Sequence, residues 1–140
     1  MPCRDHLAQL RERRSELEDF EARLVAVAFE SPSAIRQYQD EERLQVPLFR
    51  DPGRKAYRRF GLGRGEPSTI WGPQTLAYYG RELLRGRLPA KHGADAYQLG
   101  GDVILRPDLS GGWVYRSQHP ADRPSVDSVI CRLRSTRAVS

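Results

Sequence analysis

Hydrophobic residues near the start of the chain recur at the spacing of one face of an α-helix. Arginine and glutamate occupy most of the positions between them. This pattern predicts an amphipathic surface helix over residues 3–20, with a single buried stripe. The stripe consists of Leu7, Leu10, Leu17 and Phe20.

The next segment, residues 24–29 ("LVAVAF"), is a short apolar run that predicts a strand covered on both faces. Ser31 then stands at the position of a helix N-cap, and Pro32 at the first helical position. We therefore expect a polar helix that runs to about Arg43.

A second strand and helix follow the same scheme. Residues 46–49 predict a brief strand, residues 51–53 ("DPG") a turn, and the helix after them ends near Gly61. "GLGRG" at residues 61–65 lacks the G-K-[ST] ending of a phosphate loop and closes a helix, so we interpret Gly61 as a C-cap. Alternating strands and helices favour an α/β sheet with parallel strands here.

The last part of the sequence changes character. Residues 73–89 have helical apolar spacing that Gly80 interrupts. Residues 102–106 ("DVILR") and 113–117 ("WVYRS") flank a turn-rich linker and predict an antiparallel hairpin.

The chain ends on a predicted helix for which Ser125 is the N-cap. Asp122 and Arg123 form a polar turn before it, to which we assign a structural role through local hydrogen bonds. Cys131 follows Ile130, so we expect a buried or half-buried, inert thiol. The predicted core face consists of Val126, Val129, Ile130 and Leu133.

Composition narrows the classes of protein. A length of 140 residues with 39% hydrophobic and 29% charged residues fits a single domain over residues 1–140. No segment is apolar enough to cross a bilayer, and no apolar run follows a basic start, so we expect a cytoplasmic location.

The two cysteines, Cys3 and Cys131, form neither a disulfide framework nor a zinc arrangement. His92 and His119 lie in predicted loops without metal-ligand spacing, and we expect no metal and no cofactor.

The net charge of +5 would suit an anionic partner such as nucleic acid. The basic residues, however, are scattered among acidic ones instead of forming a patch. Nucleic-acid binding is therefore the weakest of the functions considered.

Cys3 is the candidate for chemistry. A thiolate at a helix N-terminus faces unpaired backbone N–H groups and the positive end of the helix dipole, and Arg4 is adjacent. His6 follows one turn later, where it could tune the thiol. The alternative is that Cys3 has no chemical role and is only part of the flexible chain end. Four aromatic residues either line a groove near the thiol or serve packing: Trp71, Tyr78, Tyr79 and Trp113.

Several stretches in the same order resemble the peroxiredoxin-like proteins of the AhpC/TSA group, members of the thioredoxin-fold superfamily. The stretches are "PCRDHLAQL", "LVAVAFESPSA", "PLFRDPGRKAYRRFGLGRG", "IWGPQTL", "YQLGGDVILRPD" and "VYRSQHPADRPSV". The resemblance implies an α/β, thioredoxin-like three-layer fold with a mixed sheet. It places Cys3 at the cysteine that begins the first core helix.

The sequence departs from this family at two places. The strand that leads into the redox helix, and the first cysteine of a Cys-x-x-Cys turn, would precede Met1. Either translation starts further upstream, or the fold is a reduced version that lacks its first strand and has a gap or an exposed edge beside residues 24–29. Residues 98–101 ("QLGG") stand where many thioredoxin-fold proteins have a cis-proline.

Together these observations predict a thiol-dependent antioxidant oxidoreductase with Cys3 as nucleophile and with Arg4 and His6 as supporting residues. Its chemistry would be peroxide reduction or thiol–disulfide exchange. The implied partners are a small-molecule peroxide or a protein disulfide, together with a thiol reductant, and a homodimer is compatible with the pattern. The alternative is a catalytically inactive thioredoxin-fold module that acts through protein contacts.

Overall fold

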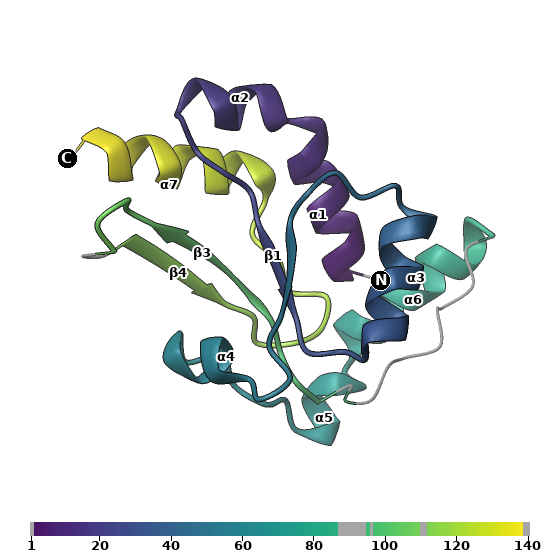
Figure 1. Ribbon diagram of the computed structural model, residues 1–140. Coiled ribbons are helices and arrows are strands. Elements are labelled where there is room, and N and C mark those ends of the chain that lie inside the picture. Colours follow the sequence, from purple (N-terminus) through teal and green to yellow (C-terminus); the bar gives the residue numbers. More distant parts are fainter. Residues whose placement is uncertain (1, 87–94, 96, 110–111, 139–140) are drawn as a thin grey trace.

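Figure 1 shows the computed structural model, in which residues 2–86, 95, 97–109 and 112–138 are described. His92 lies outside these residues. The elements are, in order, α1 (Pro2–Glu12), α2 (Arg14–Asp19), β1 (Ala26–Ala28), α3 (Pro32–Glu41), β2 (Leu48–Arg50), α4 (Lys55–Arg59), α5 (Pro67–Ile70), α6 (Pro73–Leu84), β3 (Gly101–Leu105), β4 (Gly112–Arg116) and α7 (Val126–Ala138). This mixture of helices and small sheets is compatible with the expected α/β class.

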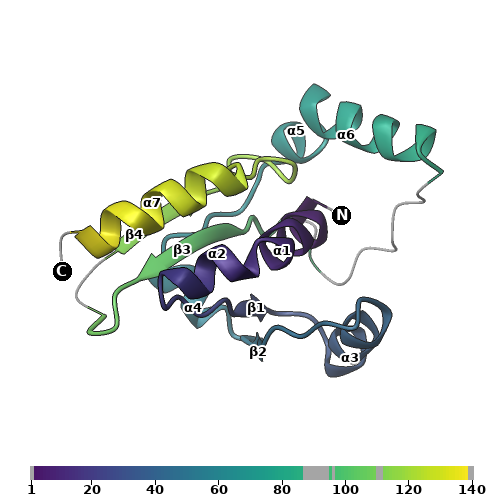
Figure 2. The same cartoon turned by 90° about the horizontal axis from the view of Figure 1, so that it is seen from above.

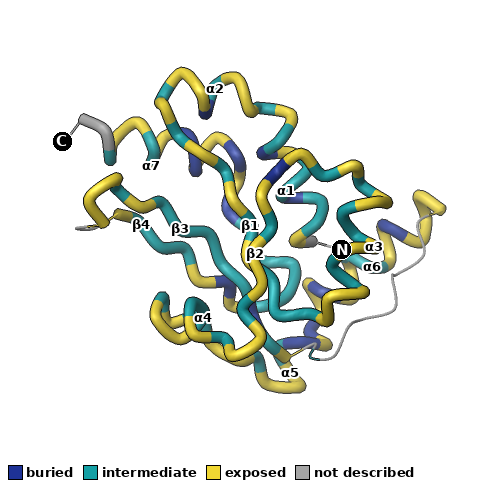
Figure 3. Tube along the Cα trace, viewed as in Figure 1, coloured by how far each residue is buried: buried dark blue, intermediate teal, exposed yellow. Residues whose placement is uncertain are grey.

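The described strands form two separate two-stranded sheets. β1 pairs with β2 in parallel, and β3 pairs with β4 antiparallel, so both predicted modes of pairing are confirmed. Figures 2 and 3 agree on the order β2, β1, β3, β4 across the molecule. No ladder joins β1 to β3 within the described residues, so the expected single mixed sheet is divided at this place. The absence of an earlier strand from the fold stays a prediction.

The strand at residues 24–29 is shorter and more exposed than predicted. Val25 and Val27 are 48% and 40% exposed, whereas Ala26 and Ala28 are half-buried. Because successive side chains of a strand point to opposite faces, one face of β1 is open to solvent. The expectation that both faces are covered was therefore wrong.

One hydrophobic core lies between the helices α1, α2 and α7 and the β3–β4 sheet. It is formed by Leu10, Leu17, Val126, Val129 and Ile130, with Ile104 and Trp113 among the half-buried residues packed against it. Figure 3 shows the buried positions of α2 and α7 on the sides where the two helices approach each other. The predicted apolar face of the last helix is thus confirmed, as are Leu10, Leu17 and Phe20 of the first, whereas Leu7 is half-buried and lies outside this cluster. The three-layer arrangement as a whole stays a prediction.

The first predicted helix is broken into two at Arg13, which leaves the helical conformation with φ −100° and ψ 24°. The Arg13 guanidinium binds Glu16 of α2 and Asp127 of α7. Leu10 and Leu17 stay on one buried face across the break. The interruption therefore changes the path of the helix without removing its stripe from the core.

Helix ends follow the sequence signals closely. Ser31 Oγ accepts a hydrogen bond from the Ala34 N–H at 3.3 Å, and Ser125 Oγ accepts one from the Ser128 N–H at 3.1 Å. Gly61 follows α4 with φ +67°, the left-handed conformation of a C-cap residue. α6, in contrast, runs continuously through Gly80, which carries no break.

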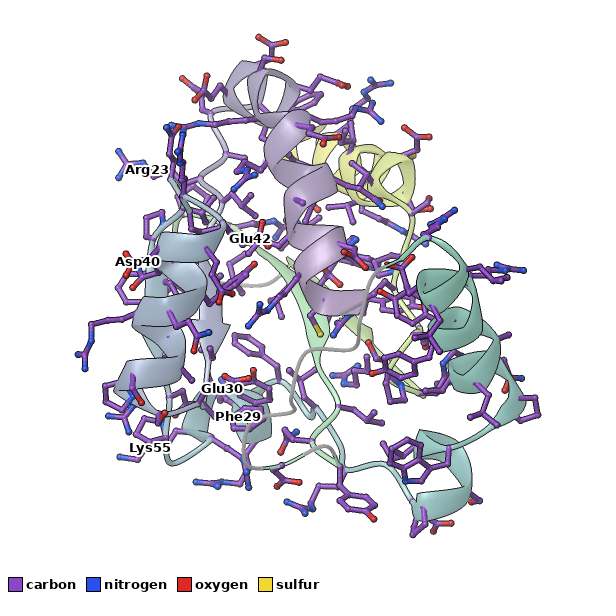
Figure 4. The ribbon with its side chains drawn as sticks, turned by 90° about the vertical axis from the view of Figure 1, so that its right-hand side faces the viewer. Arg23, Phe29, Glu30, Asp40, Glu42 and Lys55 are labelled. Carbon is purple, nitrogen blue, oxygen red and sulfur yellow. The ribbon has the colours of Figure 1, made fainter. Side chains whose placement is uncertain are left out.

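The C-terminal end of α3 lies against α1. Arg11 of α1 donates a hydrogen bond to the backbone oxygen of Glu42 at 3.0 Å. Figure 4 shows Glu42 on the side of α3 that faces α1, with Asp40 turned outward. This contact, together with the Arg4–Glu41 pair described below, holds the C-terminal end of α3 beside α1.

Cys131 is exposed, which contradicts the predicted buried or half-buried position. Each step along a helix turns by about 100°, so the residue after Ile130 points away from the core face. Ile130 is only 5% exposed. Ile130 and Cys131 therefore form a matched pair of positions at which substitutions can test the assigned core.

Replacing Ile130 by alanine should lower the free energy of unfolding by about 2–5 kcal/mol, because it removes buried methylene groups and leaves a cavity. Replacing the exposed Cys131 by alanine should change it by less than about 0.5 kcal/mol. Urea denaturation followed by circular dichroism measures both values. Equal losses in the two variants would contradict the assigned core.

Candidate thiol site at the first turn of α1

Cys3 is the second residue of α1 and is exposed as a free thiol. The first N–H groups of a helix have no partner within the helix, and the dipole is positive at this end. Both features favour a negative charge on the sulfur. The predicted placement of Cys3 at a helix start is therefore present in the structure.

Arg123 contacts this sulfur directly, because its Nη2 donates a hydrogen bond to Cys3 Sγ. The Arg123 side chain is only 12% exposed. A guanidinium stays charged at any physiological pH, and hydrogen bonds from charged donors are about twice as strong as neutral ones. Arg123 thus places a positive charge directly against the Cys3 sulfur.

The loop that carries Arg123 is held by its neighbour Asp122. The Asp122 carboxylate accepts hydrogen bonds from the Tyr115 hydroxyl at 2.5 Å and from the Gln118 N–H at 2.7 Å. Its backbone oxygen accepts one from the Ser117 hydroxyl at 2.7 Å. The structural role predicted for Asp122 fits these contacts, whereas Arg123 also reaches the thiol, a contact that the assignment of a purely structural role missed.

Asp102 and His6 extend the site behind Arg123. His6 Nε2 lies 2.7 Å from Asp102 Oδ1, and Asp102 Oδ2 lies 3.9 Å from Arg123 Nη1. His6 is 8% exposed and the Asp102 side chain 14%. The structure therefore brings His6, predicted as a supporting residue, into one cluster with Cys3. It joins them through Asp102, which sequence reasoning did not single out.

Arg4 lies on a different side of the helix. Its guanidinium stacks 4.2 Å from the centre of the Tyr38 ring and pairs with Glu41 at 3.5 Å. The supporting role predicted for Arg4 stays a prediction, since its described contacts are to α3.

Three tyrosines lie near the start of α1. Burial, followed by Glu30 and Cys3, raises the pKa of Tyr57 to about 12, and its hydroxyl donates to the Val27 oxygen at 3.1 Å. Burial and the charge of Cys3 also raise the pKa of Tyr79. The Tyr78 hydroxyl donates to Asp5, and burial together with this bond raises its pKa. The three hydroxyls therefore stay protonated at neutral pH, and those of Tyr57 and Tyr78 donate hydrogen bonds.

A shallow groove runs beside the cluster. Its lining includes Asp5, His6, Gln9, Tyr78, Arg123 and Ser125. Of the four aromatic residues suggested for a groove, Tyr78 lines it, whereas Trp113 packs against the core and Trp71 is 56% exposed. Ala121 and Pro124 complete the lining, so polar and apolar groups share the surface of the groove.

Gly100 makes room for the guanidinium. A Cβ atom at this position would lie 2.6 Å from Arg123 Nη2 and 3.1 Å from Nη1. Any larger residue would therefore displace the group that contacts Cys3. Gly100 belongs to the "QLGG" segment that departs from the pattern of many thioredoxin-fold proteins.

Other kinds of site find no support in the described part of the chain. No three His, Cys, Asp or Glu side chains there are grouped so that they could hold a metal ion. None of the helices described is both long and apolar enough to traverse a bilayer. His119, predicted to lie in a loop, is half-buried, and its Nδ1 has no hydrogen-bond partner among the described atoms.

The site thus consists of an exposed thiol at a helix start in contact with a half-buried arginine, in a protein of small sheets and helices. The chain belongs to the family described as AhpC/TSA antioxidant enzyme, whose model matches residues 9–119. The family resemblance inferred from the sequence is thereby confirmed. Cys3 and Arg123 lie on either side of the matched segment. No curated protein and no solved structure matches the chain.

Asp102 had one sequence signal that could have identified it. It is the charged residue at the start of the strand "DVIL", directly after two glycines. Charged residues are rarely buried unless they have a partner, so a carboxylate that begins an apolar strand indicates a partner elsewhere in the fold. The identity of that partner could not be inferred, since His6 precedes it by 96 positions.

Replacing Gly100 by alanine should reduce the rate of Cys3 alkylation by iodoacetamide at pH 7 about tenfold, because the displaced guanidinium no longer stabilises the thiolate. Gly63→Ala is the matched control, because a Cβ at Gly63 meets no atom within 4 Å. The rate is measured by mass spectrometry in a Cys131→Ser background. An unchanged rate in Gly100→Ala would show that Arg123 does not act on the thiol.

Proposed function

We propose that this member of the AhpC/TSA family is a thiol-dependent oxidoreductase in which Cys3 is the nucleophile. The hydrogen bond from the half-buried Arg123 guanidinium to Cys3 Sγ is the observation that supports this most directly. The family supports a thiol-dependent antioxidant or redox function. The assignment to Cys3 is our proposal.

The proposed step with a hydroperoxide begins with attack of the Cys3 thiolate on one peroxide oxygen. The S–O bond forms as the O–O bond breaks, and the leaving oxygen takes up a proton to give an alcohol or water. Cys3 becomes a sulfenic acid as the peroxide is reduced. Arg123, which donates to the sulfur, is also placed to donate to an oxygen bonded to that sulfur.

The cycle is completed by an external thiol. A reductant thiolate attacks the sulfenic sulfur and releases water, and a second thiol then resolves the mixed disulfide. Cys3 and Cys131 are the two cysteines of the chain and are both free. Cys131 lies on the exposed face of α7, so we assign it no part in the step at Cys3. The same thiolate could instead attack a protein disulfide.

One observation favours the alternative of an interaction module. Val27 and Phe49 are partners in the β1–β2 register and are 40% and 58% exposed. They form an apolar patch on a sheet face, which is typical of a contact with another protein. Self-association of a protein that shows no thiol turnover would support this second function.

The Cys3→Ser variant should lose all reduction of hydrogen peroxide and of a model disulfide in the presence of dithiothreitol, because the oxygen of serine is not an effective nucleophile here. The matched variant Cys131→Ser should retain the wild-type rate. Consumption of peroxide and trapping of the sulfenic acid by dimedone provide the measurements.

Two results would contradict the proposal. One is a wild-type protein that turns over neither substrate and forms no dimedone adduct at Cys3. The other is loss of turnover in Cys131→Ser equal to that in Cys3→Ser.

A further inference from the structure

The Asp102 carboxylate lies between two groups that it contacts unequally. Oδ1 is 2.7 Å from His6 Nε2, which is a hydrogen-bond distance. Oδ2 is 3.9 Å from Arg123 Nη1, too far for a hydrogen bond, and it has no hydrogen-bond partner among the described atoms. Asp102 therefore forms a hydrogen bond with His6 but only a long ion pair with Arg123.

Arg123 lies between two possible anionic partners, the Cys3 sulfur and the Asp102 carboxylate. Its Nη2 donates to Cys3, while its Nε is buried without a hydrogen bond among the described residues. A carboxylate and a guanidinium in contact prefer two parallel hydrogen bonds, which fix the guanidinium in the plane of the carboxylate. A small rotation of Asp102 toward Arg123 would begin such a pairing. It would also tighten the existing ion pair at 3.9 Å and draw the guanidinium away from the thiol.

We propose that His6 is a positioning residue that acts through Asp102. By holding Oδ1, His6 keeps the carboxylate from closing onto Arg123, and this leaves the guanidinium to Cys3. Because His6 and Cys3 lie one turn apart on α1, the same helix carries both the thiol and this restraint. The catalytic consequence rests on the proposed function, whereas the effect on thiol reactivity can be measured without it.

The other charged groups at the start of α1 have partners of their own. Arg4 pairs with Glu41 of α3, and Asp5 accepts a hydrogen bond from Tyr78 of α6. The titratable groups that the surrounding elements bring toward Cys3 are Tyr38 of α3, Tyr57 of α4 and Tyr79 of α6, with Glu30 next to Tyr57. The three tyrosines have raised pKa values and stay neutral below pH 9, so they do not titrate in the range of the test.

The experiment measures the alkylation rate of Cys3 against pH in a Cys131→Ser background. His6→Leu should lower the rate at pH 7 about tenfold and move the rate profile to higher pH, because Asp102 then pairs with Arg123. His6→Gln should stay near the wild-type rate, since its amide can still donate to Asp102. The double variant His6→Leu/Asp102→Asn should recover at least the wild-type rate, because the competing charge is gone.

This recovery separates the proposal from a purely structural role of His6. If the cluster only anchors α1, removing both partners should be no better than removing one. A double variant as slow as His6→Leu would therefore overturn the proposal, as would a wild-type rate in His6→Leu. Circular dichroism and thermal unfolding verify that each variant is folded.

The single variant Asp102→Asn gives an independent result in case His6→Leu does not fold. The proposal predicts a rate at pH 7 equal to or above that of the wild type, and a slower rate would overturn it. Peroxide turnover is measured in parallel. Absence of turnover in the wild type would contradict the proposed function, while the pattern of alkylation rates would still decide the role of His6.

Discussion

The hydrogen bond between the Arg123 guanidinium and the Cys3 sulfur is the contact on which the rest of the site depends. It joins residues 120 positions apart, so both ends of the described chain must be placed correctly for it to form. Gly100 leaves the space that the guanidinium occupies, and Asp122 holds the loop that presents it. Without this contact, Cys3 would be an exposed thiol at a helix start and nothing more.

The hydrophobic core holds in place the helices that carry the site. α1 with α2 and α7 pack against the β3–β4 sheet through a shared cluster that includes Leu10 and Val129. Because interiors are close-packed, a shift of either helix start would be resisted by the whole cluster. Cys3 lies on the same helix as Leu10, about two turns before it. The core therefore fixes the position of the thiol as well as the stability of the fold.

The features that could be predicted from the sequence are those that depend on residues close together in the chain. The Ser31 and Ser125 caps, the hairpin and the apolar face of α7 depend on residues a few positions apart, and the structure confirms them. The break at Arg13 and the partner of Asp102 depend on contacts between distant segments, which periodicity does not encode. Cys131 was misplaced because closeness in sequence to Ile130 does not mean a shared helix face. The placement of Cys3 at a helix start was predicted because helix starts are local features, whereas its contact with Arg123 was not.

The division between the two sheets has a consequence for how the molecule moves. β1 and β2 contribute no residue to the buried cluster between α1, α2, α7 and the other sheet, and no ladder ties β1 to β3 in the described residues. Cooperative units of a protein open with their own free energies, which are lowest where buried apolar contacts are few. The β1–β2 pair should therefore open at a lower free energy than the buried cluster. The two sheets thus belong to parts of the molecule with different local stability.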